Sequence, residues 1–155
     1  MPAEVVKTVC EPEANKRRPA NSYDAQFSIP YIVATGLLRG RFTLDELEPA
    51  AMADREVLSL AERVHHKIDV ASTFPKHYTG EVIVTLETGE ILRHREAINR
   101  GSADRPLSNA EIVAKYLDNA SRTLTRDRAE RVCTTVLGLD RAEAVDLANI
   151  LSQPV

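Results

Sequence analysis

The stretch SYDAQFSIPYIVATGLLRG, residues 22–40, decides the fold of this protein. Its central part, residues 27–38, contains only two polar side chains, Ser28 and Thr35. A run of this length is too short for a membrane span, because a spanning helix needs about 20 apolar residues. The stretch therefore predicts a buried element with a proline inside it.

Two arrangements of this stretch are compatible with Pro30, since proline removes a helical donor and collides with the preceding turn. In the first, Ser28 caps a helix that spans residues 29–39, and Pro30 lies in its first turn. In the second, a short turn from Ser22 meets the main helix at a bend. Gly40 ends the helix in either arrangement.

The expected helix is apolar on most of its sides. Its apolar residues are Ile29, Val33 and Leu37 on one face, with Tyr31, Ala34 and Leu38 beside them. A helix of this kind is expected to be a central element of the domain.

Composition limits the classes of function. The chain has 155 residues, 43% of them hydrophobic and 28% charged, which is typical of a globular protein of one domain with or without an appended helical part. A net charge of −3 gives no reason to expect nucleic acid or an anionic membrane as a partner. The N-terminus shows no secretory signal, and Cys10 and Cys133 have no disulfide or metal spacing. We therefore expect a cytoplasmic location.

The remainder of the first hundred residues mixes helix and strand signals. Residues 4–9 (EVVKTV) are β-prone, and apolar residues alternate with polar ones at Ile68–Val70 and Val82–Leu86. Thr88-Gly89 predicts a hairpin turn into a return strand, Glu90–Ala97. The predicted fold class is α+β, a two-layer antiparallel sheet with helices on one face, followed by a C-terminal helical segment.

Helix-start signals complete the predicted fold. Thr43–Glu46 and Ser108–Glu111 have capping-box spacing, and Asp54 is a plausible cap for another helix. From Pro106 onward apolar residues recur only at helical spacing. The polar segment Asn99–Arg105 predicts a seam between two parts, residues 1–105 and residues 106–155.

Motifs for catalysis or metal binding are absent from the sequence. The histidines, at positions 65, 66, 77 and 94, match no HExxH or zinc pattern, and the glycines never cluster into a phosphate-binding loop. The residue pattern therefore predicts no catalytic residue and no metal site. One alternative left open is a compact enzyme whose site is built from His65, His66, Asp69 or His77.

The string AQFSIPYIVATGLLRGRFTLDEL (Ala25–Leu47) resembles the C-terminal part of the MmgE/PrpD family, which includes 2-methylcitrate dehydratase, cis-aconitate decarboxylase and iminodisuccinate epimerase-like proteins. The matching residues of this block are Pro19, Asp24, Ala25, Phe27, Ser28, Pro30, Tyr31, Ala34, Leu37, Leu38 and Gly40. Further matches are Gly80–Leu86 with Thr88-Gly89, then Gly101, Arg105–Ser108, Glu111 and Lys115. The resemblance covers nearly the whole chain.

The resemblance implies a two-domain architecture and a class of chemistry. Family members are cofactor-free enzymes that act on small di- and tricarboxylic acids, with the active site between a large helical domain and a smaller α/β domain. Residues 1–105 would correspond to the small domain, and the helices of residues 106–155 to the segment that returns to the large one. The large helical domain, in cis or in trans, is thus the implied partner.

One departure from the family affects the expected activity. The family's catalytic lysines and histidines come mainly from the large domain and from a Lys/Tyr-Pro…His motif ahead of the small domain. We expect the chain to start after that motif, which Lys16 and Pro19 do not recreate because no histidine follows in place. No catalytic residue is therefore carried over to this chain.

The resemblance does imply a set of pocket-lining residues. By the resemblance, Tyr31 corresponds to an aromatic residue that faces the pocket in the decarboxylase branch, and Ser28 and Phe27 would border it. A phenol at this place could hydrogen-bond a substrate carboxylate.

Two hypotheses follow for function. The first is the C-terminal domain, or a separately encoded half, of a family lyase or isomerase that is inactive alone. The second is a non-enzymatic binding, regulatory or oligomerisation module that keeps the fold without the chemistry. If the chain exists alone, the amphipathic helices of the tail predict self-association, most simply as a two-fold dimer.

Overall fold

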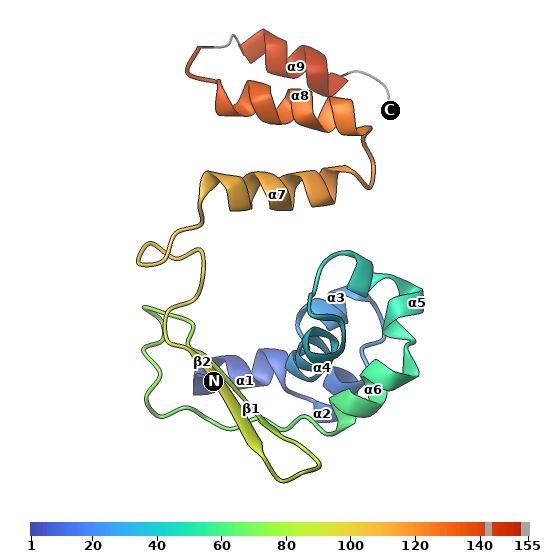
Figure 1. The fold of residues 1–155 in the computed structure, drawn as a ribbon, viewed down its shortest axis with the longest axis vertical. Helices are drawn as coiled ribbons and strands as arrows, with labels where there is room; N and C mark the ends of the chain where they lie inside the picture. Colours follow the sequence, from blue (N-terminus) through green and yellow to red (C-terminus); the bar gives the residue numbers. More distant parts are fainter. Residues whose placement is uncertain (142–143, 153–155) are drawn as a thin grey trace. The chain divides into compact units, whose positions relative to one another are not determined.

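The computed structural model describes residues 1–141 and 144–152, and it divides into two compact units, Met1–Arg105 and Pro106–Val155 (Figure 1). Residues 142, 143 and 153–155 of the predicted tail lie outside the described residues.

The first unit begins with a series of short helices and ends with a β-hairpin. Its elements are α1 (Ala3–Val9), α2 (Glu13–Arg17), α3 (Ser22–Gln26), α4 (Ile29–Arg39), the 3₁₀ turn η1 (Asp45–Leu47), α5 (Pro49–Met52), α6 (Arg55–Glu62), β1 (Gly80–Thr85) and β2 (Ile91–Glu96). The second unit consists of α7 (Asn109–Ala120), α8 (Arg126–Leu137) and α9 (Ala144–Ser152).

The helix α4 begins and ends as its sequence predicts. The Ser28 side chain accepts a hydrogen bond from the backbone N–H of Tyr31 at 3.1 Å, and Pro30 lies in the first turn. Gly40 ends the helix with a φ of 71°, the left-handed conformation that favours glycine. The second arrangement is also partly realised, because residues 22–26 form a separate short helix, α3, before the bend.

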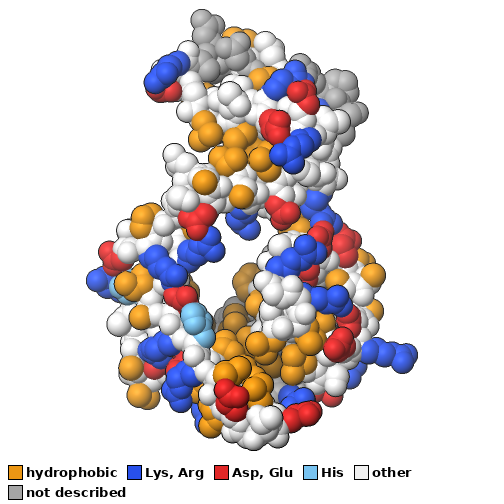
Figure 2. All heavy atoms as spheres, viewed as in Figure 1, with side chains coloured by type: hydrophobic (Ala, Val, Ile, Leu, Met, Phe, Trp, Pro, Cys, Tyr) orange, Lys and Arg blue, Asp and Glu red, His pale blue; other side chains and the backbone are white. Residues whose placement is uncertain are grey.

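Small side chains let α4 and its neighbours pack closely. The buried core of the first unit consists of Ala25, Tyr31, Ala34, Val57 and Ala61, from α3, α4 and α6. Alanine at the contact between two helices brings their backbones together, and the single large residue fills the remaining space. Only one side of α4 is covered in this way; in Figure 2, further apolar side chains gather over α4 and its neighbours.

The hairpin has the turn predicted at Thr88-Gly89. Antiparallel pairing runs from Gly80 opposite Glu96 to Thr85 opposite Ile91. The N–H of Gly89 bonds the carbonyl of Leu86 at 2.9 Å, and Gly89 has a φ of 85°. These features are those of a type I turn closed by a left-handed glycine, which fits the twist of the two strands.

The structure confirms an α+β chain with a small antiparallel sheet, and it corrects two of the expected strands. Residues 4–9 belong to α1 rather than to a strand; Glu4 in the first turn and Lys7 in the last suit the helix dipole, and Val6 and Cys10 are buried on one face. Ile68–Val70 is not a strand either, and the Val70 side chain is 98% exposed. The sheet among the described residues has two strands, β1 and β2, rather than three.

The second unit is helical, as expected. The predicted capping box is present at α7, where the Ser108 hydroxyl accepts from the N–H of Glu111 and the Glu111 carboxylate accepts from the N–H of Ser108. Arg128 of α8 is 8% exposed and donates to the carbonyls of Ile150 and Leu151, at 3.2 and 3.1 Å, near the end of α9. In Figure 2, apolar side chains gather where α7 faces α8.

Two glycines of one helix should respond to alanine with opposite signs. A Cβ at Gly36 or at Gly40 would meet no atom within 4 Å, so only backbone conformation differs between the two sites. We expect Gly40→Ala to destabilise by about 1–2 kcal/mol, because its φ is positive. Gly36→Ala, inside the helix, should stabilise by about 1 kcal/mol. Urea denaturation checks both, and a Gly40→Ala variant as stable as the wild type would contradict the assigned cap.

Candidate functional site

Tyr31, the main residue that the resemblance implies for the pocket, lies at the centre of the first unit. Its side chain is fully buried, and its ring meets that of Phe42 edge-on with 6.0 Å between centroids. The hydroxyl donates a hydrogen bond of 2.6 Å to the backbone carbonyl of Glu46. Burial raises the pKa of the Tyr31 phenol, so the group remains a neutral donor near pH 7.

A polar cleft of about 480 Å³ opens above Tyr31. The residues that line it are Tyr31, Thr35, Arg39, Arg41, Asp45, Glu46, Ala51 and Val57. Both arginines are paired with carboxylates: Arg39 with Asp54, and Arg41 with Asp45 at 3.2 Å and Glu46 at 2.9 Å. The cleft is therefore polar, but its positive charges already have partners.

Glu46 organises the wall of this cleft. Glu46 is 6% exposed. Its carboxylate accepts hydrogen bonds from the N–H and the hydroxyl of Thr43, at 2.7 and 2.8 Å, and from Nε of Arg41 at 2.9 Å. Burial alone would raise the pKa of Glu46, but these hydrogen bonds outweigh it and the net pKa is lowered. The same turn presents the carbonyl that receives the Tyr31 hydroxyl, so one network holds both.

Ser28 and Phe27 are placed differently from Tyr31. Ser28 is fully buried; its hydroxyl donates to the carbonyl of Lys16 and accepts the cap bond of α4. Phe27 is 37% exposed and packs on Tyr23 with ring centroids 5.1 Å apart. Neither residue lines the cleft above Tyr31. Their role in a substrate pocket stays a prediction.

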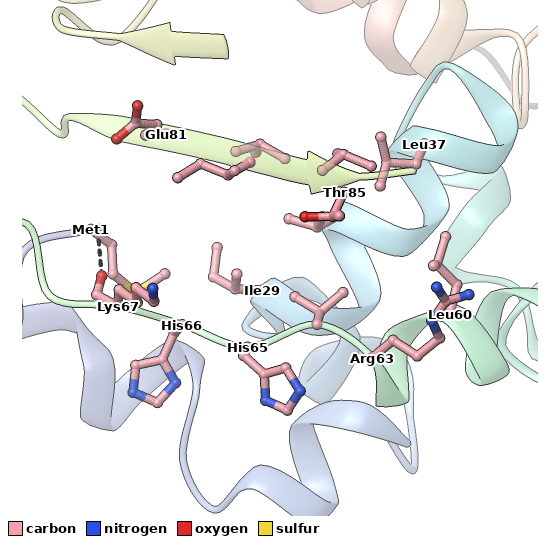
Figure 3. A pocket seen from close by; sticks show the side chains of 15 residues that line it. Met1, Ile29, Leu37, Leu60, Arg63, His65, His66, Lys67, Glu81 and Thr85 are labelled. Carbon is pink, nitrogen blue, oxygen red and sulfur yellow. Dashed lines mark hydrogen bonds between the residues drawn. The ribbon is translucent and has the colours of Figure 1, made fainter. Parts of the chain in front are cut away.

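A second cavity, of about 340 Å³, separates β1 from the chain that follows α6 (Figure 3). Its floor is the other apolar face of α4, formed by Ile29, Val33 and Leu37. Its two walls are consecutive residues of two segments, 63–67 and 81–85, with Met1 at one end. Consecutive residues line each wall, although alternate side chains of an extended segment point to opposite faces. The cavity therefore borders the backbone edges of the two segments.

The histidines are distributed over separate sites. In Figure 3 the rings of His65 and His66 point away from β1, and Nδ1 of His65 lies 3.3 Å from the Arg17 guanidinium. Asp69, the carboxylate considered with them, pairs with Arg95 at 2.8 Å. Thus the structure does not join these three side chains into one constellation. Among residues 1–141 and 144–152, no group of three His, Cys, Asp or Glu is arranged to hold a metal ion.

His77 forms a pair that the sequence does not reveal. It is 8% exposed, with Nε2 at 2.7 Å from Asp104 and Nδ1 at 3.3 Å from the Thr73 hydroxyl. The hydrogen bond to His77, aided by Lys76, lowers the pKa of Asp104. The partners are 27 positions apart, and only the folded loops bring them together. The arrangement ties the loop before β1 to the loop after β2.

Comparison with known proteins places these features in a family context. Residues 1–141 match the family described as the MmgE/PrpD C-terminal domain. The "Cis-aconitate decarboxylase-like protein oryM" of Aspergillus oryzae is 28% identical over 140 residues, which cover 90% of this chain and 28% of that protein. The "Cis-aconitate decarboxylase" of Mus musculus is 28% identical over 143 residues, which cover 90% and 29% respectively. The chain thus spans less than a third of the length of these curated relatives.

In the part of the chain that the structure describes, no helix has the length and apolarity needed to cross a membrane.

Removing the Tyr31 hydroxyl should weaken the first unit. Tyr31→Phe leaves the buried Glu46 carbonyl without its donor, so we expect a loss of about 1 kcal/mol in the free energy of unfolding. Tyr23→Phe is the matched control; the Tyr23 side chain is 69% exposed and should change stability by less than about 0.5 kcal/mol. Equal effects of the two substitutions in urea denaturation would show that the bond contributes nothing.

Acid should destabilise the protein partly through Glu46. Because the folded pKa lies below the unfolded value of about 4.3, the contribution of Glu46 is fully present above that pH and is lost as the pH falls through the folded pKa. Glu46→Gln should therefore lower the melting temperature near pH 7 and flatten its fall between about pH 5 and pH 3. Parallel pH profiles for the two proteins would contradict this assignment.

Proposed function

The chain belongs to the MmgE/PrpD family, in which it corresponds to the C-terminal domain, and on this premise we propose that it is one part of a cofactor-free lyase or isomerase acting on small di- and tricarboxylic acids. The observation that carries the proposal is the family match over residues 1–141, together with the decarboxylase names of its relatives. Because the match covers less than a third of those relatives, we propose that the chain is inactive by itself and that a large helical part completes the site.

Tyr31 is the residue that this proposal assigns to the substrate. Its phenol is neutral and buried, as suits a hydrogen-bond donor to a substrate carboxylate. The single O–H is engaged by the Glu46 carbonyl, so it has to leave that carbonyl in order to donate to a ligand. The turn at residues 43–46, which holds the Glu46 carbonyl in place, would then determine the free energy of moving the Tyr31 O–H from that carbonyl to a ligand. Ser28 fixes the start of the helix that carries Tyr31.

We also propose that the second unit associates with another helical surface, either the large part or a second copy in a two-fold dimer. No residue of α7 is buried, and Ile112 is 50% exposed. On α8, Val136 and Leu137 are 46% and 60% exposed. Apolar side chains in such number on one small unit are typical of an interface. Cytoplasmic location is part of the proposal, since both cysteines are free thiols.

The proposal is tested by incubating the purified chain with 2-methylcitrate, citrate or cis-aconitate and following the ultraviolet absorbance. The absorbance rises when a conjugated double bond forms and falls when it is consumed. We expect no turnover by the 155-residue chain, because the proton-transfer groups would come from the other part.

The second arm adds the large part of the Mus musculus relative, truncated ahead of its matched stretch. Turnover in the mixture, reduced by Tyr31→Phe, is the expected result. Turnover by the chain alone would show a complete catalytic set within these residues and overturn the proposal. Tight binding of the acids without turnover in either arm would favour a binding module.

A further inference from the structure

The unpaired edge of β1 faces an extended segment across the cavity shown in Figure 3. The chain from residue 64 to residue 69 runs without a turn and in the direction opposite to β1: Arg63 lies near the Thr85 end, and Lys67 near the Glu81 end. No backbone hydrogen bond joins the two segments among the described residues. Two strand-like edges thus border one slot over an apolar floor.

The hairpin register shows which groups of β1 point into the slot. The N–H of Leu86 donates to the Glu90 carbonyl at 2.9 Å, so Leu86 belongs to a hydrogen-bonded pair. Such pairs recur at every second residue in an antiparallel ladder. The N–H and C=O groups of Glu81, Ile83 and Thr85 therefore point away from β2 and towards the slot.

The opposite edge already carries one residue in a strand-like ladder. The amino group of Met1 donates to the carbonyl of Lys67 at 3.0 Å, and the N–H of Asp69 donates to the carbonyl of Met1 at 2.7 Å. This pattern is that of a parallel pair in which Met1 lies opposite Ile68. By the same alternation, the backbone groups of His65 also point into the slot. The N–H groups of residues 65–68 have no backbone acceptor among the described residues.

The position of Met1 fixes the direction of an occupant. Polypeptide that continues backwards from Met1 along this ladder would pass Lys67, His66 and His65 in turn. It would run antiparallel to β1, which is the pairing that a hairpin edge forms most readily. A single strand suits the slot better than a hairpin of a second copy, because one strand pairs with both bordering edges at once, whereas a hairpin can pair each of its strands with only one of them.

We propose that the slot binds one extended strand of about five residues, supplied by the polypeptide that stands ahead of this domain in the longer family members. The strand bonds β1 on one side and residues 65–67 on the other, ahead of the bonds that Met1 makes to Lys67 and Asp69, and so joins the two edges into a continuous sheet. The source of the strand rests on the proposed function; the slot itself rests on the geometry.

The two faces of the sheet completed by the strand indicate which side chains the strand should carry. Towards α4 it meets Ile29, Val33 and Leu37, so every second side chain is apolar. On the other face it lies beside Glu81, Ile83 and Thr85, and Glu81 is paired with Arg93 and Arg95, so a polar side chain suits the Glu81 end of the strand.

The test uses the 155-residue chain and a ten-residue peptide with the sequence that immediately precedes the matched stretch of the Mus musculus relative. Amide hydrogen exchange is measured residue by residue. In the free chain the amides of Ile83 and Thr85 should exchange freely, whereas those of Val82 and Val84, paired with β2, are protected. The peptide should slow exchange at Ile83 and Thr85 by at least about tenfold and leave Val82 and Val84 unchanged.

Proline variants separate the slot from the other edge of the hairpin. Ile83→Pro removes an N–H that points into the slot, and Ile91→Pro removes one from the free edge of β2, where proline is equally tolerated. Peptide affinity should fall by about tenfold in the first and by less than about twofold in the second. A peptide that is N-methylated at alternate residues should bind the wild-type chain no more tightly than the unmodified peptide binds the Ile83→Pro variant.

Two results would overturn the proposal that a strand binds in the slot. Protection of Ile83 and Thr85 in the free chain would mean that residues 64–69 close directly onto β1. Absence of peptide protection, or equal losses in the two proline variants, would mean that no strand enters. These outcomes are distinct from failure of the proposed function: turnover by the two parts without protection at Ile83 rejects only the slot, and protection without turnover rejects only the enzymatic role.

Discussion

Helix α4 has two apolar faces that both need to be removed from water, and this constraint organises the first unit. One face, with Tyr31 and Ala34, is buried against α6 through small side chains. The other, with Ile29, Val33 and Leu37, faces β1 and the cavity beside it, and Leu37 remains 49% exposed. A free energy of about 25 cal/mol for each Å² of apolar surface removed from water favours any element that covers this second face.

The same constraint connects packing with function. Tyr31 sits on the covered face and is held by the turn whose carboxylate, Glu46, is itself held by Thr43 and Arg41. The uncovered face borders the slot. Thus the side of α4 that carries Tyr31 is buried and hydrogen-bonded, while the opposite side borders a cavity and is only partly covered. On the proposed function, binding of the large part would stabilise the domain and complete its site together.

The sequence was most informative where a local interaction decides the structure. Ser28 and Gly40 at the ends of α4, the Ser108–Glu111 box and the Thr88-Gly89 turn all depend on residues within a few positions of one another. It failed where packing overrides propensity: the β-branched residues of α1 form a helix because Val6 and Cys10 find buried places on one face. The family block identified Tyr31, but no sequence signal indicated that its hydroxyl bonds the Glu46 carbonyl 15 positions away. The proposed slot has no sequence signal for a related reason, since the alternation at Ile68–Val70 favours a strand that is already paired.

We propose that polypeptide outside this family domain completes its site. A chimera in which the chain replaces the matched 143 residues of the Mus musculus cis-aconitate decarboxylase tests this most directly. We expect a folded chimera that consumes cis-aconitate, measured by loss of its ultraviolet absorbance. A chimera that folds with the parent's secondary structure and oligomeric state, yet neither binds nor converts the acid, would contradict it.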